Sequence, residues 1–310
     1  MTVPIILDCD PGHDDALAIL LALGCPEIDL LAVTTVAGNQ TLAKTTLNAR
    51  RVCTAAGVTD VPIYAGCDRP LLRQQIIASD IHGESGLDGP AWAEPTVPVA
   101  DEHAVDFLVR TLMRAEEQIT LVPVGPLTNI ATALAREPRI AERTREVVLM
   151  GGSYTRGNTT PAAEFNIMAD PEAAAMVFQA GWQVTMVGLD LTHQALAYPA
   201  VVDDIAAIGT PLSAIVVDIL TFFRHSYQQV AGFPAPPVHD PCAVARVARP
   251  DLVAVRDAFV AVETKGEWTA GMTVTDFAGL LGRPANAQVA TELDAAGFWN
   301  LMTASLRALQ

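Results

Sequence analysis

Positive charge is scarce in this sequence. The chain has 19 lysine and arginine residues against 35 aspartates and glutamates, so its 310 residues carry a formal net charge of −16. A protein of this sign repels phosphate backbones and anionic lipid headgroups, and we therefore expect neither a nucleic-acid nor a membrane partner. A small neutral or cationic ligand, or a bound metal cation, suits this charge better.

The sequence also lacks paired cysteines and apolar segments of membrane length. Its five cysteines are scattered, with no CxxC pair and an odd total, which favours a reducing compartment over a disulfide framework. The longest unbroken apolar runs are about ten residues, well short of the roughly 20 needed to cross a bilayer. The start, MTVPIILDCD, has no basic n-region and no cleavage site. We therefore expect a soluble, cytoplasmic protein.

Charged residues are few, at 17%, whereas hydrophobic residues reach 51%, so the chain can fill a large core. Apolar, β-rich runs alternate with helical patterns over the first 190 residues. The predicted strands are 3–7, 28–38, 61–66, 119–124, 146–152 and 184–190, and the predicted helices are 14–24, 41–57, 102–117, 127–136 and 171–180. This alternation predicts an α/β fold with a mostly parallel, doubly wound, Rossmann-like sheet flanked by helices.

Two stretches interrupt the alternation. Residues 67–100 are rich in glycine and proline and read as a long irregular loop, which in a compact domain is usually functional or flexible. A helical insertion is predicted near 196–232. The rest of the chain is predicted to hold a helix within 233–248, strands near 252–263, 272–276 and 287–292, and a helix at 294–308. Without a Gly- or Ser-rich linker or an internal repeat, residues 1–310 are predicted to form a single domain.

The segment ILDCDPGHDD places four aspartates within ten residues. Asp8 and Asp10 end the first predicted strand, and Asp14 and Asp15 open the helix after it. Acids at a helix N-terminus gain only about 0.3–1 kcal/mol each from the helix dipole, which accounts for one or two of them but not four. A bound cation would neutralise the cluster, and oxygen ligands without a nearby thiol or imidazole favour Ca²⁺ or Mg²⁺ over zinc.

Polar side chains follow several of the other predicted strands. They are Asn39 in AGNQ, the groups of GPLTN and GGSYTRGN, Glu164, Asn166 and Asp170 in AEFNIMADPEAA, and His239 and Asp240 in VHDP. Ligands of open α/β sheets bind outside the carboxyl ends of the strands, so we expect these groups to converge with the first acids on one crevice. Carboxylates and amides suit the hydroxyl groups of a sugar. A nucleoside triphosphate is disfavoured because no GxxxxGK[ST] loop is present.

At this point the sequence resembles the inosine-uridine preferring nucleoside hydrolase family. DCDPGHDDALAI matches the DxDPGxDDA signature of that family. Five later segments of this sequence resemble the later conserved blocks of the family, in the same order. They are HGESGLDGP (82–90), VPVGPLTNIA (122–131), MGGSY (150–154), PAAEFNIMADPEAA (161–174) and HDPCAVA (239–245). The resemblance spans nearly the whole chain. It implies hydrolysis of the N-glycosidic bond of uridine- or inosine-type ribonucleosides to free base and ribose, with one bound Ca²⁺, in a homodimer or homotetramer.

The resemblance also implies a role for particular residues. The metal ligands would be the side chains of Asp10, Asp15 and Asp240 and the main-chain carbonyl of Val124. The ribose would be bound by Asp14, Asn39, Asn158, Glu164 and Asn166, with Met150 against the sugar. Asp10 would take the proton of the attacking water, and His239 and His82 would protonate or stabilise the departing base. Asp8 would orient its neighbours rather than bind the metal.

Several assignments stay open at this stage. His13, at a variable position of the signature, is expected to have no catalytic role, whereas His225 could face the base together with Phe223 and Tyr227. Trp268 is either a base-stacking aromatic or an ordinary surface residue. Preference for a purine or a pyrimidine depends on residues 220–235, which we do not assign to either group. Asp170 is predicted to cap the helix that begins at the following proline.

Two other functions compete with nucleoside hydrolysis. A haloacid-dehalogenase-like phosphatase also has a DxD motif after its first strand, but there the common continuation is Gly-Thr, and no convincing later lysine and acidic pair is present here. A calcium-dependent nucleoside- or ribose-binding protein without turnover would need neither a base such as Asp10 nor an acid such as His239.

Overall fold

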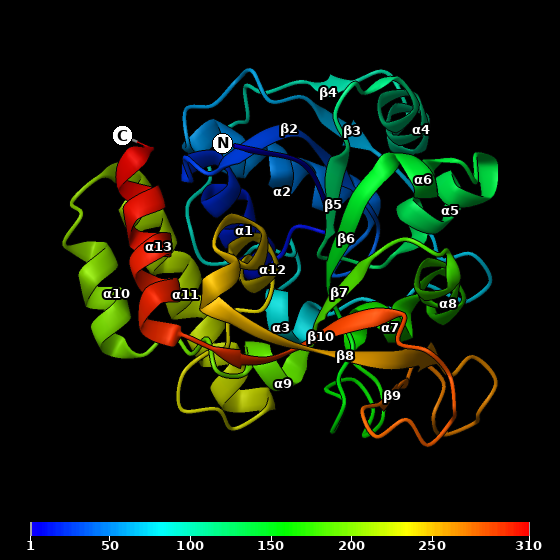
Figure 1. The fold of residues 1–310 in the computed structure, drawn as a ribbon. Coiled ribbons are helices and arrows are strands. Elements are labelled where there is room, and N and C mark those ends of the chain that lie inside the picture. Colours follow the sequence, from blue (N-terminus) through cyan, green and yellow to red (C-terminus); the bar gives the residue numbers. More distant parts are fainter. Residues whose placement is uncertain (1, 310) are drawn as a thin grey trace.

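The computed structural model describes residues 2–309. Within them, ten strands form one sheet with the order β4-β3-β2-β1-β5-β6-β7-β10-β8-β9 (Figure 1). The strands are β1 (Val3–Cys9), β2 (Ile28–Thr35), β3 (Ile63–Ala65), β4 (Val99–Ala100), β5 (Ile119–Pro123), β6 (Thr144–Met150), β7 (Val184–Val187), β8 (Val253–Val262), β9 (Thr273–Asp276) and β10 (Ala287–Leu293). Pairing is parallel from β4 through β7 to β10, and β8 and β9 add antiparallel strands at one edge. The predicted α/β class is confirmed.

Helices cover both faces of this sheet. The helices are α1 (His13–Gly24), α2 (Leu42–Ala55), α3 (Ser79–His82), α4 (Ala104–Arg114), α5 (Thr128–Arg136), α6 (Ile140–Arg143), α7 (Phe165–Ala169), α8 (Pro171–Gln179), α9 (Leu189–Thr192), α10 (Pro199–Ala206), α11 (Pro211–Val230), α12 (Pro241–Ala248) and α13 (Ala295–Ala308). One buried cluster joins the sheet to α1, α2, α11, α12 and α13, and a second joins it to α4, α5 and α8. Strand β1 serves both clusters, because Ile5 and Leu7 pack in the first and Ile6 packs in the second.

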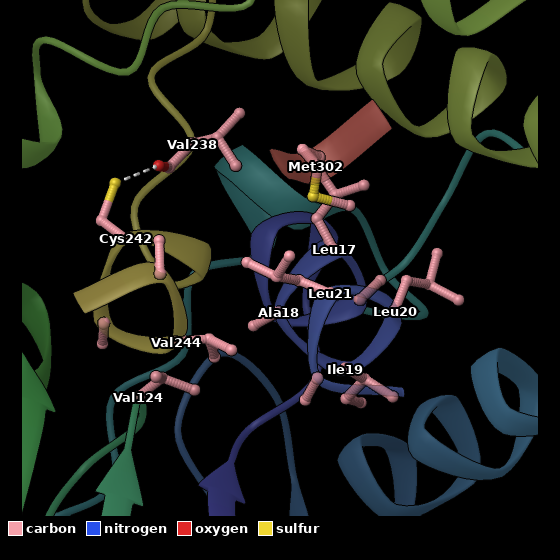
Figure 2. Close-up of a cluster of buried hydrophobic side chains, with 14 of the residues drawn as sticks. Leu17, Ala18, Ile19, Leu20, Leu21, Val124, Val238, Cys242, Val244 and Met302 are labelled. Carbon is pink, nitrogen blue, oxygen red and sulfur yellow. Dashed lines mark hydrogen bonds between the residues drawn. The ribbon is translucent and has the colours of Figure 1, made fainter. Parts of the chain in front are cut away.

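Helix α1 is apolar around its whole circumference and lies inside the molecule. Of its 12 residues only Leu23 is partly exposed, as expected for a helix that packs on every side. It contacts α2, α11, α12 and α13, and Figure 2 shows Leu17 and Leu21 of α1 beside Met302 of α13, with Val244 of α12 nearby. Burial on all sides fixes the N-terminus of α1, which carries two of the predicted site aspartates.

The structure differs from the sequence prediction mainly at short elements. The predicted strand 184–190 ends at Val187, because the chain turns at Gly188 into the one-turn helix α9. Helices α3, α6, α7 and α9 span only four or five residues each, which is too short for a helical period to appear in the sequence. Residues 67–100 are largely irregular, as predicted, but contain α3 and β4. Between residues 2 and 309, no helix combines the length and the apolar character needed to cross a bilayer.

Candidate active site

The candidate site lies beside β1, where the order in which successive strands are added to the sheet reverses. Strand β1 has β2 on one side and β5 on the other, both parallel to it, so the loops after these strands diverge and leave a crevice at their carboxyl ends. The main-chain N–H of Val124, just after β5, donates to the carbonyl oxygen of Asp8 at 2.7 Å. This contact joins the ends of β1 and β5 at the floor of the crevice.

A cavity of about 330 Å³ occupies this crevice. All the site residues predicted from the sequence line it except Asp10 and Asp15, which are fully buried beside it. The predicted residues that line the cavity are Asp14, Asn39, His82, Val124, Met150, Asn158, Glu164, Asn166, His239 and Asp240. Others that line it are Ile76, Ile77, Ala78, Asp80 and Ile81 from the 67–100 region, and Tyr227, Val230 and Ala231 from the end of α11. The cavity therefore gathers residues from across the whole sequence.

Three aspartates meet at one end of the cavity. Asp14, Asp15 and Asp240 each offer a carboxylate oxygen, and these oxygens lie within 4.8 Å of one another. Asp15 is held in place by the main-chain N–H groups of Asp10 and Gly12, which donate to its two oxygens at 3.0 Å and 2.9 Å. These two hydrogen bonds tie the loop after β1 to the start of α1, so that the turn brings the aspartates close together.

Asp10 adjoins these three acids, and its carboxylate is held on one oxygen only. The main-chain N–H of Asn39 donates to Oδ2 at 2.6 Å, whereas Oδ1 is buried without a hydrogen-bond partner among the described residues. A Cβ added at Gly38 or at Gly125 would collide with this carboxylate. The two glycines therefore allow the loops after β2 and β5 to approach Asp10 closely.

The buried acids lack a compensating positive side chain. Burial raises the pKa of Asp14 to about 8 and that of Glu164 to about 7, and it also raises the pKa values of Asp10, Asp15 and Asp240. No lysine or arginine occurs among the described residues that line the cavity. The charge of these carboxylates must be offset by protons or by a bound cation.

The donor set fits a hard divalent cation. The acid cluster offers carboxylate oxygens, and Val124 lines the same cavity; such oxygen ligands are the ones that Ca²⁺ and Mg²⁺ prefer. The Val124 carbonyl accepts a hydrogen bond from Nδ2 of Asn166 at 2.8 Å, which leaves its second lone pair for another partner. An unpartnered buried carboxylate oxygen beside a cluster of acids is thus the observation that supports a metal site here.

Glu164 and Asn166 form a rigid wall of the cavity. Glu164 caps α7, accepting hydrogen bonds from the main-chain N–H groups of Asn166, Ile167 and Gly152 at 2.9–3.1 Å. Nδ2 of Asn166 also donates to the carbonyl oxygen of Met150 at 3.2 Å. Because these polar groups are fixed before any ligand binds, the remaining lone pairs of Glu164 and the side-chain oxygen of Asn166 can accept from hydroxyl groups at little entropic cost.

A chain of hydrogen bonds runs through His239, which directly precedes Asp240 of the acid cluster. Its Nδ1 lies 2.7 Å from Oγ1 of Thr192, and its Nε2 lies 2.7 Å from the hydroxyl oxygen of Tyr227. Burial lowers the pKa of His239 to about 3, so the ring is neutral near pH 7. A neutral imidazole with a partner on each nitrogen can accept a proton at one nitrogen and release one at the other.

Tyr227 is the site residue that the sequence analysis did not single out for catalysis. It lines the cavity with its hydroxyl on His239, whereas His225 is exposed on the opposite side of α11. Phe223 and Tyr227 are four residues apart and therefore share the buried face of this helix. This four-residue spacing is the sequence signal that could have identified Tyr227 as a site residue. It also distinguishes Tyr227 from His225, which is exposed.

The remaining candidates lie outside the cavity. Trp268 is 81% exposed and does not line it, so the structure favours the surface role over base stacking. Asp170 caps α8 as predicted, with Oδ1 accepting from the main-chain N–H of Ala173 at 3.1 Å. Asp8 accepts hydrogen bonds from Asn129 and Thr34 on its Oδ1 and does not line the cavity.

Comparison with known proteins covers almost the entire chain. The sequence model of the family described as inosine-uridine preferring nucleoside hydrolase matches residues 5–300. The inosine-uridine preferring nucleoside hydrolase of Crithidia fasciculata is 51% identical over 100% of this chain and 99% of that protein. The pyrimidine-specific ribonucleoside hydrolase RihA of Shewanella woodyi is 49% identical over 99% of this chain and 98% of that protein.

Solved structures agree with these sequence matches. A purine-preferring ribonucleoside hydrolase from Gardnerella vaginalis has a TM-score of 0.93 at 32% identity, covering 99% of this chain and 98% of that one. A plant nucleoside hydrolase has a TM-score of 0.91 at 29% identity, covering 99% of each chain. The similar proteins thus differ in the bases that their names specify while sharing one fold.

Proposed function

The chain belongs to the inosine-uridine preferring nucleoside hydrolase family, and from this premise we propose that it hydrolyses the N-glycosidic bond of uridine- and inosine-type ribonucleosides in nucleoside salvage. The products would be a free base and ribose. The observation that carries the proposal is the cavity, which brings a cluster of buried acids together with the Tyr227–His239 pair. A nucleoside suits both groups, because it joins a polyhydroxylated sugar to an aromatic base.

A divalent cation, which we propose to be Ca²⁺, would be held by the side chains of Asp10, Asp15 and Asp240 and the carbonyl of Val124. When bound, it would supply Lewis acidity toward water and a fixed charge that anchors vicinal hydroxyl groups. Asp14 shares the cluster with two of these ligands. We assign it to the sugar, as its position in the DxDPGxDDA signature implies, and it lines the cavity.

Asp10 is proposed as the general base. Its Oδ1 has no hydrogen-bond partner within residues 2–309, so this oxygen is available to accept the proton of an attacking water. Its Oδ2 is held by Asn39, which keeps the carboxylate from rotating. The base is therefore oriented before the substrate arrives.

The ribose would be bound by Asp14, Asn39, Asn158, Glu164 and Asn166, with Met150 packed against it. Cleavage of the bond between sugar and base builds positive charge on the ribose, as in other glycoside hydrolyses. The carboxylates of Glu164 and Asp14, both of which line the cavity, would stabilise this charge. Their fixed hydrogen bonds mean that little reorganisation is needed as the charge develops.

The departing base would receive its proton from the Tyr227–His239 pair, with His82 as a further hydrogen-bonding group. Tyr227 and His239 are joined by a hydrogen bond of 2.7 Å, and both line the cavity. Thr192 continues the chain behind His239. A proton given up at the cavity face could then be replaced through His239.

Neither competing function accounts for this arrangement. A haloacid-dehalogenase-like phosphatase does not fit a chain that belongs to a nucleoside hydrolase family. A protein that only binds nucleosides has no need for the free carboxylate oxygen of Asp10 or for the Tyr227–His239 pair. A homodimer or homotetramer and a cytoplasmic location remain predictions, the first testable by light scattering of the purified protein.

The direct test is a panel of uridine, inosine, cytidine and adenosine, with the products separated by chromatography. We expect free base and ribose, and we expect their release to be the same with and without inorganic phosphate, because water is the acceptor. Release of phosphate from p-nitrophenyl phosphate would favour the phosphatase instead. Binding of nucleosides with no products would leave the protein a sensor and reject the hydrolase.

A further inference from the structure

His13 and His82 meet edge to edge although they are 69 residues apart. His13 begins α1 and His82 ends α3, and their Nδ1 atoms lie 3.1 Å apart. Their ring centroids are 5.3 Å apart, with an angle of 23° between the planes. The distance between the ring centres is close to the Nδ1–Nδ1 distance plus the two short distances from each Nδ1 to the centre of its own ring. Both nitrogens therefore lie near the line that joins the two ring centres. The geometry is that of an N–H···N hydrogen bond and not of face-to-face stacking.

The other nitrogen of His13 determines which tautomer this residue adopts. Nε2 of His13 lies 2.8 Å from the carbonyl oxygen of Asp88. A carbonyl oxygen can only accept, so Nε2 of His13 carries the hydrogen, and in a neutral imidazole Nδ1 then holds a lone pair. Phe222 and Phe223 stack on the His13 ring at centroid distances of 5.0 Å and 5.2 Å, which keeps this lone pair directed at His82.

The main chain of His13 also directs a hydrogen-bond donor at Nδ1 of His82. Its main-chain N–H points at Nδ1 of His82, with a distance of 3.2 Å between the nitrogens. This N–H lies in the first turn of α1, where main-chain N–H groups have no partner within the helix. Nδ1 of His82 therefore faces one donor and one acceptor from a single residue. It has a hydrogen-bond partner whether or not it carries a proton.

The opposite nitrogen of His82 faces the substrate side. His82 lines the cavity, and its hydrogen bonds to the described residues are all made through Nδ1. When Nδ1 accepts from the main chain of His13, Nε2 carries a hydrogen and can donate. When Nδ1 donates to the His13 ring, Nε2 holds a lone pair and can accept.

We propose that His13 is a positioning residue that gives His82 access to both neutral tautomers, so that Nε2 of His82 can either donate a hydrogen bond to the nucleobase or accept one from it. This rests on the proposed function, because it places the base in this cavity. It suits bases such as uracil and hypoxanthine, which carry both carbonyl and N–H groups on their edges. One histidine could then serve bases with different patterns of donors and acceptors.

Two kinds of variant separate the contributions of His13. His13→Leu removes the ring acceptor and keeps the main-chain donor, so His82 should be locked with its hydrogen on Nε2. His13→Ala makes the same removal with less bulk, in case the leucine does not fit. His13→Asn places an amide oxygen near the position of the lost Nδ1 and should restore the second tautomer.

The primary test is ¹⁵N NMR of histidine-labelled protein in buffer with calcium chloride, with the His82 signals assigned from a His82→Gln variant. We expect a population with hydrogen on Nδ1 of His82 in the wild type and in His13→Asn, and none in His13→Leu or His13→Ala. The same tautomer in all four proteins would overturn the proposal. Because this measurement needs no substrate, it stands even if the wild type hydrolyses no nucleoside, a result that would reject the proposed function alone.

A kinetic test determines whether Nε2 of His82 faces the base. The ratio of kcat/KM for uridine to that for cytidine should change about two- to tenfold in His13→Leu, since a hydrogen bond between neutral groups has this effect. His13→Asn should bring the ratio back toward the wild-type value. A lost tautomer with an unchanged ratio would overturn the base-facing role of Nε2.

Discussion

The hydroxyl oxygen of Tyr227 lies 2.7 Å from Nε2 of His239, and this bond joins α11 to the loop before α12. His239 directly precedes Asp240 of the acid cluster, so the pair proposed to protonate the base adjoins the groups that would hold the metal. The acid cluster would activate water and bind the sugar, and the Tyr227–His239 pair would release the base. Variants of the two groups should therefore respond differently to the leaving group.

Removal of the imidazole of His239 should slow natural nucleosides far more than p-nitrophenyl riboside. His239→Ala is expected to lower kcat for uridine by about 10²–10⁴-fold, the usual contribution of general acid catalysis. The nitrophenolate leaving group needs no proton and should be lost at nearly the wild-type rate. Steady-state kinetics on both substrates provide the check, and equal losses would remove the acid role from His239.

Tyr227→Phe should have a smaller effect in the same direction. The ring still packs against Phe223, but the hydroxyl group on His239 is lost, and we expect a decrease of about two- to tenfold in kcat/KM for uridine. His225→Phe is a matched control on the exposed side of the same helix. If the two variants behaved alike, the hydroxyl of Tyr227 would have no part in catalysis.

Asp10→Asn tests the proposed base while keeping the size of the side chain. We expect a loss of about 10²–10⁴-fold in kcat for uridine and for p-nitrophenyl riboside alike, because both need an activated water. Asp251, an exposed acid that is ion-paired with Arg249, offers a control in Asp251→Asn, which should retain full activity. Wild-type turnover by Asp10→Asn would show that another group takes the proton.

Calcium should stabilise the protein more at high pH than at low pH. Burial raises the pKa values of Asp14 and Glu164 to about 8 and about 7, so between about pH 4 and 8 the metal-free folded state binds protons that the unfolded state has released. The free energy of unfolding of the metal-free protein therefore falls as pH rises through this window. Protons also compete with the cation for the carboxylates.

Thermal unfolding with EDTA and with excess calcium chloride, at about pH 5 and about pH 8, measures this difference. The increase in Tm on adding calcium is expected to be larger at the higher pH. Magnesium chloride tests whether the site distinguishes the two cations. Burial also raises the pKa values of Asp10, Asp15 and Asp240, so a shift that was the same at both pH values would mean that these three carboxylates do not bind the metal.

Helix α1 should be sensitive to loss of side-chain volume on every face. Leu21→Ala is expected to lower the free energy of unfolding by about 2–5 kcal/mol, because its side chain is fully buried. Leu23→Ala removes the same atoms from the partly exposed position of the same helix and should have a clearly smaller effect. Denaturant unfolding in the presence of calcium measures both, and equal losses would contradict the arrangement around α1.

The sequence predicted the sheet well because its strands are buried on both faces and read as continuous apolar runs such as ITLVPV and EVVLM. Asp8 and Asp10 were predictable as site residues because they follow the first strand directly, whereas the roles of Glu164 and Asp240, which stand in later loops, came from the family resemblance. One-turn helices such as α3 and α7 were not predictable, since four or five residues show no period. The contact of His13 with His82 was also beyond sequence reasoning, because it depends on how the 67–100 region folds over the start of α1.

Glu164 has two roles, because it caps α7 and is also proposed to bind the ribose. Three main-chain N–H groups depend on its carboxylate, and a cap of this kind contributes about 0.5–2 kcal/mol. Directed evolution toward a different sugar cannot alter this side chain without loosening the turn that carries Asn166. Libraries that vary Glu164 should therefore also vary residues 158–163, so that a new cap can arise together with a new specificity.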